Sequence, residues 1–409
     1  MNTAPALSLK PRTYMAVLAV LGVAHFLNDL MQSLIPAIYP IIQRSYDLDF
    51  AQIGLITLTF QIAGSLLQPL VGVYTDRRPA PYSPVIGMVF TLSGLIALAF
   101  AGSYAAILVA VALIGIGSSI FHPEATRMAR YAAGGRQGLA QGMFQVGGQA
   151  GGALGPVCAA LIIVPLGQPS LAWFTAAALS AMLLLTWIGR QQAAISLHFA
   201  AVRQSLAGHQ ANLPCHATST IAIGLVVLTL LMFSKNAYGE SFRSFYTFYL
   251  IERFGLSIPA SQMMLFVFLM ASAAGALIGG IVGDRIGRYR IIWISVLGPL
   301  PLTLILPYAD LFWTGVLTVS INLIMASAFA SILIYAMELL PSRIGLIGGL
   351  FYGLNFGLGG IAAAILGGMA DRYGIEAVYH FCSFLPLAGL LAWFLPRIEQ
   401  DRPGAAAKP

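Results

Sequence analysis

Twelve long apolar runs, separated by short polar segments, constrain this chain more than any other feature of its sequence. A helix needs about 20 mostly apolar residues to cross a bilayer, and each run comes close to that length or exceeds it. A closed β-barrel also spans membranes, but its strands are alternating segments of about 10 residues, shorter and less continuous than these runs. The sequence therefore predicts an all-α polytopic membrane protein with 12 transmembrane helices.

The runs fall into two sets of six. The first set covers about 14–42, 51–74, 83–101, 104–131, 137–164 and 170–189. The second covers about 218–250, 260–282, 290–307, 312–339, 345–369 and 376–395. A polar segment, 191–217, lies between them, and we expect it to be a cytoplasmic linker. The predicted domains are thus an N-terminal six-helix bundle at 1–190 and a C-terminal bundle with its tail at 218–409.

Composition excludes the soluble classes. Of the 409 residues, 58% are hydrophobic and 9% are charged, whereas soluble proteins carry near 25% charged residues. A soluble enzyme, a nucleic-acid-binding protein and a disordered scaffold are therefore ruled out. The three cysteines (Cys158, Cys215 and Cys382) have no metal-binding spacing, so we expect no disulfide framework, no metal and no cofactor.

The basic residues predict the orientation. With both termini in the cytoplasm, cytoplasmic loops and span ends hold 16 of the 21 lysines and arginines, and outside loops hold only Arg44, Arg253 and Arg372. This asymmetry matches the positive-inside rule. The first apolar run is too long for a signal peptide, so we expect no cleaved leader. We expect a multi-pass monomer in the inner (plasma) membrane.

The two halves resemble each other in sequence. Arg136–Phe144 matches Arg343–Phe351 at an offset of 207 residues, and Gly72–Arg77 matches Gly280–Arg285 at an offset of 208. Two matches at nearly one offset predict two pseudo-symmetric six-helix bundles. Parallel repeats of this kind place the substrate near the bilayer midplane, between the halves.

These motifs resemble those of the major facilitator superfamily. The segment Gly280-x-x-x-Asp284-Arg285-x-Gly287-Arg288 is similar to its loop motif, while the first copy keeps Gly72, Asp76 and Arg77 but has Pro79 in place of a glycine. Gly147–Pro156 resembles the glycine-proline motif of superfamily antiporters. The resemblance covers the whole chain and implies the major facilitator fold and transport by alternating access.

A narrower resemblance implies a substrate. His25–Asp29 in the first span and Phe121–Arg127 in the fourth are similar to the fosmidomycin resistance protein group, whose members are thought to export a small phosphonate antibiotic against a proton gradient. One departure is Val111, which stands where many drug–proton antiporters have an arginine. Proton handling therefore has to use other residues.

The loop motif has a physical explanation. A carboxylate at the end of a span, as at Asp76 and Asp284, accepts hydrogen bonds from a neighbouring helix N-terminus and pairs with basic residues. Such contacts latch two helical bundles in one state; the alternative is a charge cluster that only sets topology. In the fifth span, Gly147, Gly151 and Gly155 form one stripe for close packing, and Pro156 favours a bend.

Ionisable residues inside the spans are costly and are usually functional. His25 and Asp29 lie one turn apart and are predicted to form a proton site, with a static hydrogen-bonded pair as the alternative. His122 and Glu124 are further proton-coupling candidates, and Glu124 is expected to pair with Arg127. Glu338 is a fifth candidate, with a loop pair to Arg343 as the alternative.

The seventh span contributes the predicted substrate site. Lys235 has no carboxylate one turn away, so it needs Asp29, another distant partner or an anionic substrate. Glu240 and Arg243 are expected to pair, and the aromatic residues from Tyr238 to Tyr249 favour a core or lipid-facing stripe. The predicted substrate-binding residues are Asn28, Arg127, Lys235, Asn236, Tyr238 and Arg243.

The favoured hypothesis is a proton-coupled antiporter that exports small anionic drugs; the alternative is a proton-coupled importer of a small anionic nutrient. A passive channel or membrane sensor fits the duplicated halves less well. A membrane enzyme lacks a nucleophile–base constellation or phosphate-binding loop in the sequence. The predicted partners are the lipid bilayer, protons and a small anion, with no nucleic acid.

Overall fold

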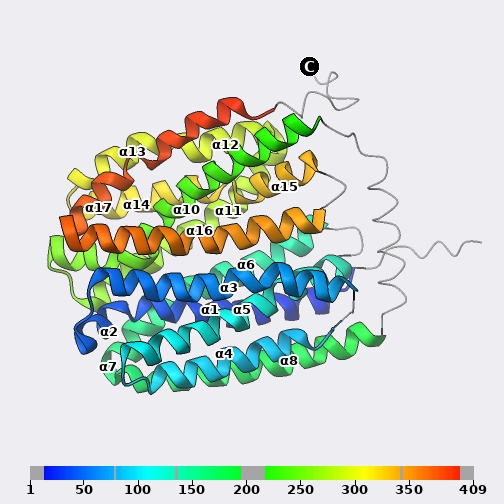
Figure 1. Ribbon diagram of the computed structural model, residues 1–409, viewed down its shortest axis with the longest axis horizontal. Coiled ribbons are helices and arrows are strands. Elements are labelled where there is room, and N and C mark those ends of the chain that lie inside the picture. The colour runs from blue at the N-terminus through cyan, green and yellow to red at the C-terminus, as the bar shows by residue number, and fades with distance from the viewer. Residues whose placement is uncertain (1–12, 78–79, 134–136, 195–216, 341–343, 397–409) are drawn as a thin grey trace, which may run out of the picture.

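The structure is a computed structural model that describes residues 13–77, 80–133, 137–194, 217–340 and 344–396. Every regular element in these ranges is a helix (Figure 1). The first half contains α1 (Met15–Ala37), α2 (Tyr39–Tyr46), α3 (Phe50–Arg77), α4 (Ser83–Ala99), α5 (Tyr104–Ala132), α6 (Gln137–Cys158), the π-helix η1 (Ala159–Ile163), α7 (Val164–Leu166), the 3₁₀ helix η2 (Gln168–Phe174) and α8 (Thr175–Ala194).

The second half contains α10 (Thr218–Phe254), α11 (Ile258–Ile286), α12 (Arg288–Leu297), α13 (Leu300–Ile305), η3 (Leu306–Tyr308), α14 (Leu311–Ala326), α15 (Phe329–Leu339), α16 (Ile344–Tyr373), α17 (Ile375–Cys382) and η5 (Leu385–Phe394). Ten helical segments of the described chain are long and apolar enough to cross a membrane. With α4 (17 residues) and α16 (30 residues), they account for the twelve predicted runs.

Prolines divide several of the predicted runs. The first run was expected over 14–42, but α1 ends at Ala37 and α2 begins at Tyr39, with Pro40 at its second position. Proline has no N–H to donate to the preceding turn, so the helix breaks there. Gly298 and Pro299 separate α12 from α13 in the same way. In the fifth span, the π-helix η1 begins three residues after Pro156.

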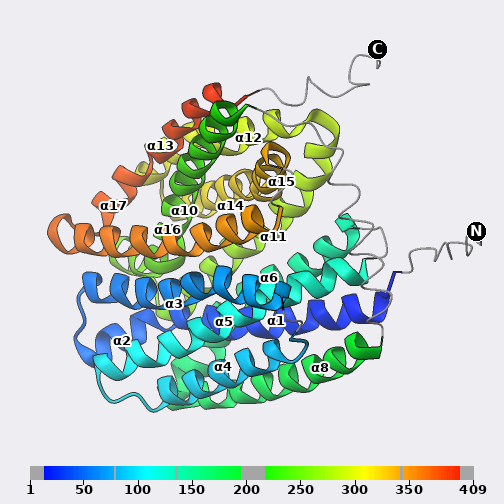
Figure 2. The same cartoon turned by 45° about the vertical axis from the view of Figure 1, so that its right-hand side comes forward.

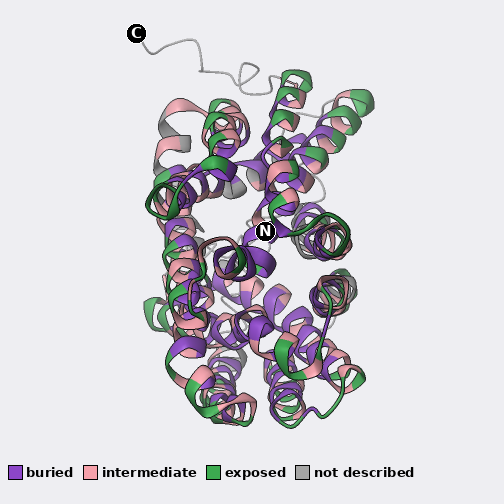
Figure 3. Ribbon diagram, turned by 90° about the vertical axis from the view of Figure 1, so that its left-hand side faces the viewer, coloured by how far each residue is buried: buried purple, intermediate pink, exposed green. Residues whose placement is uncertain are grey.

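The surface of the helical assembly is apolar. Exposed positions gather on its outer side, and buried positions gather between the helices (Figure 3). Large apolar side chains are among the most exposed, including Leu183 and Trp393 at 74% and Phe312 at 71%. Such a surface fits hydrocarbon rather than water, because a soluble protein rarely exposes apolar residues in continuous patches.

The two halves meet along α3 and α16, which lie side by side (Figures 1 and 2). Glycines bring their backbones together: a Cβ atom at Gly54 would lie 2.5 Å from the Ala363 carbonyl oxygen. A Cβ atom at Gly360 would lie 3.1 Å from the Leu58 Cα atom. On the other side of the molecule, α6 packs against α11.

Candidate functional site

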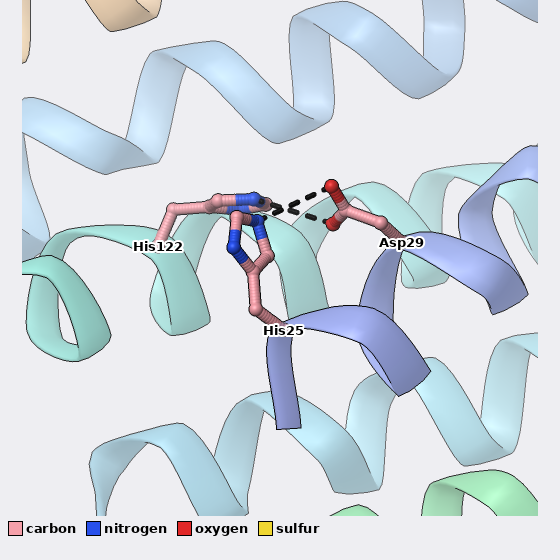
Figure 4. A group of neighbouring side chains, drawn as sticks. All are labelled: His25, Asp29 and His122. Carbon is pink, nitrogen blue, oxygen red and sulfur yellow. Dashed lines mark ion pairs between the residues drawn. The ribbon is translucent and has the colours of Figure 1, made fainter. Parts of the chain in front are cut away.

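Three ionisable side chains meet between α1 and α5 (Figure 4). The Asp29 carboxylate lies 3.2 Å from His25 Nε2 through Oδ2 and 3.5 Å from His122 Nε2 through Oδ1. Asn28 Nδ2 donates to Asp29 Oδ1 at 2.9 Å. Both imidazoles are buried, and 26% of the Asp29 side chain is exposed. Among the described residues, this is the one group of three such side chains close enough to hold a small cation.

The backbone determines which nitrogen of each histidine faces Asp29. His25 Nδ1 lies 2.7 Å from the Phe144 carbonyl oxygen, and His122 Nδ1 lies 3.0 Å from the Ser118 carbonyl oxygen. A carbonyl only accepts, so His25 Nδ1 carries a proton and the Nε2 of a neutral His25 ring is bare. His122 Nδ1 also lies 3.1 Å from the Ser118 hydroxyl, which can donate to it, so a neutral His122 ring can carry its proton on Nε2 and donate to Asp29. A bare His25 Nε2 facing the ionised Asp29 carboxylate would repel it. One proton bound between His25 Nε2 and Asp29 Oδ2 removes this repulsion and makes the three side chains neutral overall.

Helix α6 covers the cluster closely. The Phe144 ring stacks on the His25 ring with centroids 3.9 Å apart. A Cβ atom at Gly148 would lie 2.5 Å from His25 Nε2 and 2.7 Å from Asp29 Oδ2, so a methyl group there would displace both side chains. Gly148 therefore allows α6 to sit directly over the cluster.

A second charged pair lies on α5. Arg127 donates to Glu124 Oε1 at 2.7 Å, which is the pairing expected from their i, i+3 spacing. Glu124 is fully buried and 13% of the Arg127 side chain is exposed. His122 extends from the same helix to Asp29, so α5 contributes to both groups.

Glu240 and Arg243 form the corresponding pair on α10, at 3.1 Å, again as expected from the sequence. Ser244 Oγ donates to the other oxygen of Glu240 at 2.7 Å. Ser244 also lies 3.2 Å from the Thr57 hydroxyl of α3, and Thr57 lies 2.7 Å from the Tyr39 hydroxyl. This polar chain crosses from one half of the protein to the other, and 46% of the Arg243 side chain is exposed at its end.

Lys235 has a neutral partner. Its Nζ donates to Ser295 Oγ of α12 at 3.3 Å, and no described carboxylate lies within 4.0 Å of it. Asp29 was one expected partner, but its two oxygens face His25 and His122 instead. Glu240 pairs with Arg243. Asn236, beside Lys235, is buried.

The aromatic residues of α10 belong to the core. Five of them (Tyr238, Phe242, Phe245, Tyr246 and Tyr249) are at most 2% exposed. Phe242 stacks on Phe268 of α11 with centroids 4.6 Å apart, and Tyr249 packs on Tyr379 of α17 at 4.1 Å. This arrangement agrees with the expected core stripe, and Tyr238, one of the predicted substrate-binding residues, is part of it.

The glycine stripe of α6 packs against α1. A Cβ atom at Gly147 would lie 2.8 Å from the Gly22 carbonyl carbon, and one at Gly151 would lie 3.0 Å from the Leu30 nitrogen. At Gly155 it would lie 2.7 Å from the Ser33 Cβ atom. These glycines keep α6 close to the helix that carries His25 and Asp29, and Pro156 ends the stripe.

Most of the loop-motif side chains lie outside the described part of the structure. They are Gly72, Asp76, Arg77, Gly280, Asp284 and Arg285. The side chain of Glu338, the fifth proton-coupling candidate, also lies outside the described part. Gly287 is described: it has φ 92° and precedes α12, which starts at Arg288. A positive φ favours glycine, which explains why the motif has a glycine at this position.

Sequence reasoning missed the residues that complete the site from other helices. Ser118 lies one turn before His122, so helical spacing could have identified it. Gly148, the Phe144 carbonyl and Ser295 gave no such signal, because they meet the charged residues only through the packing of separate helices.

Comparisons with known proteins agree with this architecture. Residues 21–364 match the Major Facilitator Superfamily. The chain is 54% identical to the fosmidomycin resistance protein of Escherichia coli (strain K12) over 393 residues, and this aligned region covers 96% of each chain. It is 40% identical over 393 residues to the uncharacterized MFS-type transporter YfnC of Bacillus subtilis (strain 168), with 95% of each covered.

Solved structures show the same fold at low sequence identity. A bacterial homolog of the human lysosomal transporter Spinster, in an inward-facing and occupied conformation, matches with a TM-score of 0.70 and 13% identity over 93% of this chain and 94% of that one. The nucleoside transporter NupG matches with a TM-score of 0.69 and 14% identity over 92% and 99%.

Proposed function

Because this chain belongs to the Major Facilitator Superfamily, we propose that it is a proton-coupled antiporter that exports small anionic drugs of the phosphonate type. It is a multi-span membrane transporter, and its family is one of transporters rather than enzymes. The observation that carries the drug-export proposal is the 54% identity to a fosmidomycin resistance protein along nearly the whole chain. The buried ionisable residues support the coupling to protons.

In this proposal, the cluster of His25, Asp29 and His122 binds the proton. Without a proton, the bare His25 Nε2 faces a carboxylate; with one proton between them, the three side chains are neutral overall and this contact is attractive. A buried group that changes charge in this way changes how its helices pack against each other. Glu124 transmits this change in packing along α5, since it lies two residues from His122 and pairs with Arg127.

The substrate anion is proposed to bind Lys235, whose only described partner is a hydroxyl group. Arg243 follows two turns later on the same helix and has an exposed side chain, so its guanidinium can contact a second oxygen of a phosphonate. Arg127 supplies a cation from the first half. Asn236 and Asn28 are buried, and we propose that they position Lys235 and Asp29.

Alternating access needs contacts that form in one state only. We propose this role for the loop motifs at Gly72–Arg77 and at Gly280–Arg288, with Asp76 and Asp284 as helix-capping carboxylates. Pro156 and the π-helix after it provide a bend at which α6 can change shape. The proposed arrangement is two six-helix bundles joined by the linker at 191–217, with both termini in the cytoplasm.

Reconstitution in vesicles tests the proposal. With an imposed pH gradient, protons should flow down their gradient and fosmidomycin should move in the opposite direction. Both movements should require the protein. Movement of drug and protons in the same direction would favour the alternative, a proton-coupled importer of a small anion. Drug movement that is insensitive to the gradient would contradict proton coupling.

Gly148→Ala should uncouple transport from the proton gradient. The added methyl group would displace His25 and Asp29, so gradient-driven transport should fall toward the level of protein-free vesicles while drug binding persists. Gly152→Ala is the matched control: it lies one turn later on α6, and a Cβ atom there would have no neighbour within 4 Å. Equal gradient-driven rates in both variants would contradict the proton site.

A further inference from the structure

The loop-motif pattern occurs a third time, at the opposite end of the helices. Gly367-x-x-x-Asp371-Arg372-x-Gly374 has the same spacing as Gly280-x-x-x-Asp284-Arg285-x-Gly287. The backbone is alike as well: each pattern ends a long helix, α16 or α11. The last glycine of each has a positive φ, 83° at Gly374 and 92° at Gly287, and precedes the next helix. The two segments therefore share a local backbone structure as well as a sequence pattern.

The carboxylate of this third copy caps a helix of the other half. Asp371 Oδ1 accepts from the Phe50 N–H at 2.8 Å, and Oδ2 accepts from the Ala51 N–H at 2.7 Å. These are the first two residues of α3. The next N–H, that of Gln52, is bonded by Asp49 Oδ1 at 2.6 Å within the same half. The first N–H groups of a helix have no partner within the helix, so Asp371 supplies partners for two that α3 cannot satisfy alone.

The motif glycine makes this contact possible. A Cβ atom at Gly367 would lie 2.9 Å from the Phe50 carbonyl carbon and 3.3 Å from the Ala51 Cα atom. Without a side chain, α16 contacts the first turn of α3 directly, and Asp371 follows one turn later at the helix end. A negative charge at a helix N-terminus is also favoured by the helix dipole. Gly367 thus permits the close approach of the two helices, Asp371 accepts the hydrogen bonds, and Gly374 forms the turn into α17.

We propose that Asp371 is an extracellular latch, which holds α16 against α3 and stabilises the conformation closed to the outside. This inference rests on the orientation proposed above, which makes the Asp371 end extracellular. Both hydrogen bonds exist only while the ends of α3 and α16 are adjacent, so opening of this end breaks them together. Loss of such a cap changes an equilibrium constant by about five-fold.

Spin-label distances test the latch without any substrate or gradient. The three native cysteines are replaced by serine, and nitroxides are attached at Ser45 and Ser257, two exposed positions at this end, one in each half. Asp371→Ala should raise the ratio of long to short distances by about five-fold relative to the parent. Gly367→Ala should shift the distances in the same direction, because its methyl group pushes the helices apart.

Asp310→Ala is the matched control. Asp310 is also exposed and caps a helix, α14, by accepting from the Trp313 N–H at 2.8 Å, but it makes this contact within its own half. It should leave the distances unchanged. An unchanged distribution in Asp371→Ala, or an equal shift in Asp310→Ala, would overturn the latch.

The side of the membrane is checked separately. A cysteine at Ser257 should react with a membrane-impermeant maleimide in intact cells. Reaction only after permeabilisation would overturn the extracellular assignment. Since neither measurement involves a drug or a proton gradient, failure of the proposed transport activity would leave both results interpretable.

Discussion

Lys235→Ala is expected to weaken the binding of anionic phosphonates by about 2–5 kcal/mol, or at least about 30-fold in Kd. The reason is the neutral surroundings of this cation, whose described contact is one serine hydroxyl at 3.3 Å. A lone ammonium inside a membrane costs at least about 2.5 kcal/mol on insertion scales, and a bound anion offsets that cost. Binding of fosmidomycin to the purified wild type and variant measures the effect.

An uncharged ester of fosmidomycin provides the comparison for this prediction. Its affinity should be the same in the wild type and in Lys235→Ala, and lower than that of the acid in the wild type. Ser295→Ala is the matched variant, since it removes the hydroxyl partner and keeps the charge; it should affect anion binding far less. A large drop in melting temperature in Lys235→Ala, with equal loss of acid and ester binding, would show that Lys235 is structural.

Asp29→Asn should abolish gradient-driven transport and spare the exchange of drug across the membrane without a gradient. Asparagine preserves the shape of the side chain but carries no negative charge, so a proton bound beside His25 or His122 no longer has a carboxylate to stabilise it. The measurements are drug efflux driven by a pH gradient and drug counterflow at equal pH, both in vesicles. Efflux should fall to the level of protein-free vesicles.

Asp47→Asn is the control for this second prediction. Asp47 is exposed at the end of α2, in a left-handed conformation that asparagine also adopts readily. It should leave both measurements unchanged. Loss of counterflow together with efflux in Asp29→Asn would indicate a structural role for the carboxylate instead of a proton-carrying one.

Helical periodicity explains which parts of the site were predictable. The contacts between His25 and Asp29, Glu124 and Arg127, and Glu240 and Arg243 each lie within one helix, three or four residues apart, so the sequence determines them. The twelve apolar runs were predictable for a similar reason, because their length follows from the bilayer thickness.

Contacts between helices were not predictable in this way. His122 joins Asp29, Ser295 receives Lys235, and Asp371 caps α3 only because separate helices pack in a particular register. The pattern around Asp371 was present in the sequence, but its meaning depends on the approach of α16 to α3. The helix breaks near Pro40 and Pro299 were also missed, since a hydropathy pattern continues across them.

The hydroxyl groups that join the two halves affect how easily the protein can cycle. Thr57 and Ser244 form a polar contact across the seam, and Tyr39 bonds Thr57 from within the first half. Water can replace the hydrogen bond between Thr57 and Ser244 when the halves separate. A hydrogen bond contributes only about 0.5–1.5 kcal/mol net, because solvent offers a similar partner. A purely hydrocarbon seam would resist wetting and tend to stay shut. A polar seam can be closed in one conformation of the transport cycle and filled with water in the other, with little net change in free energy.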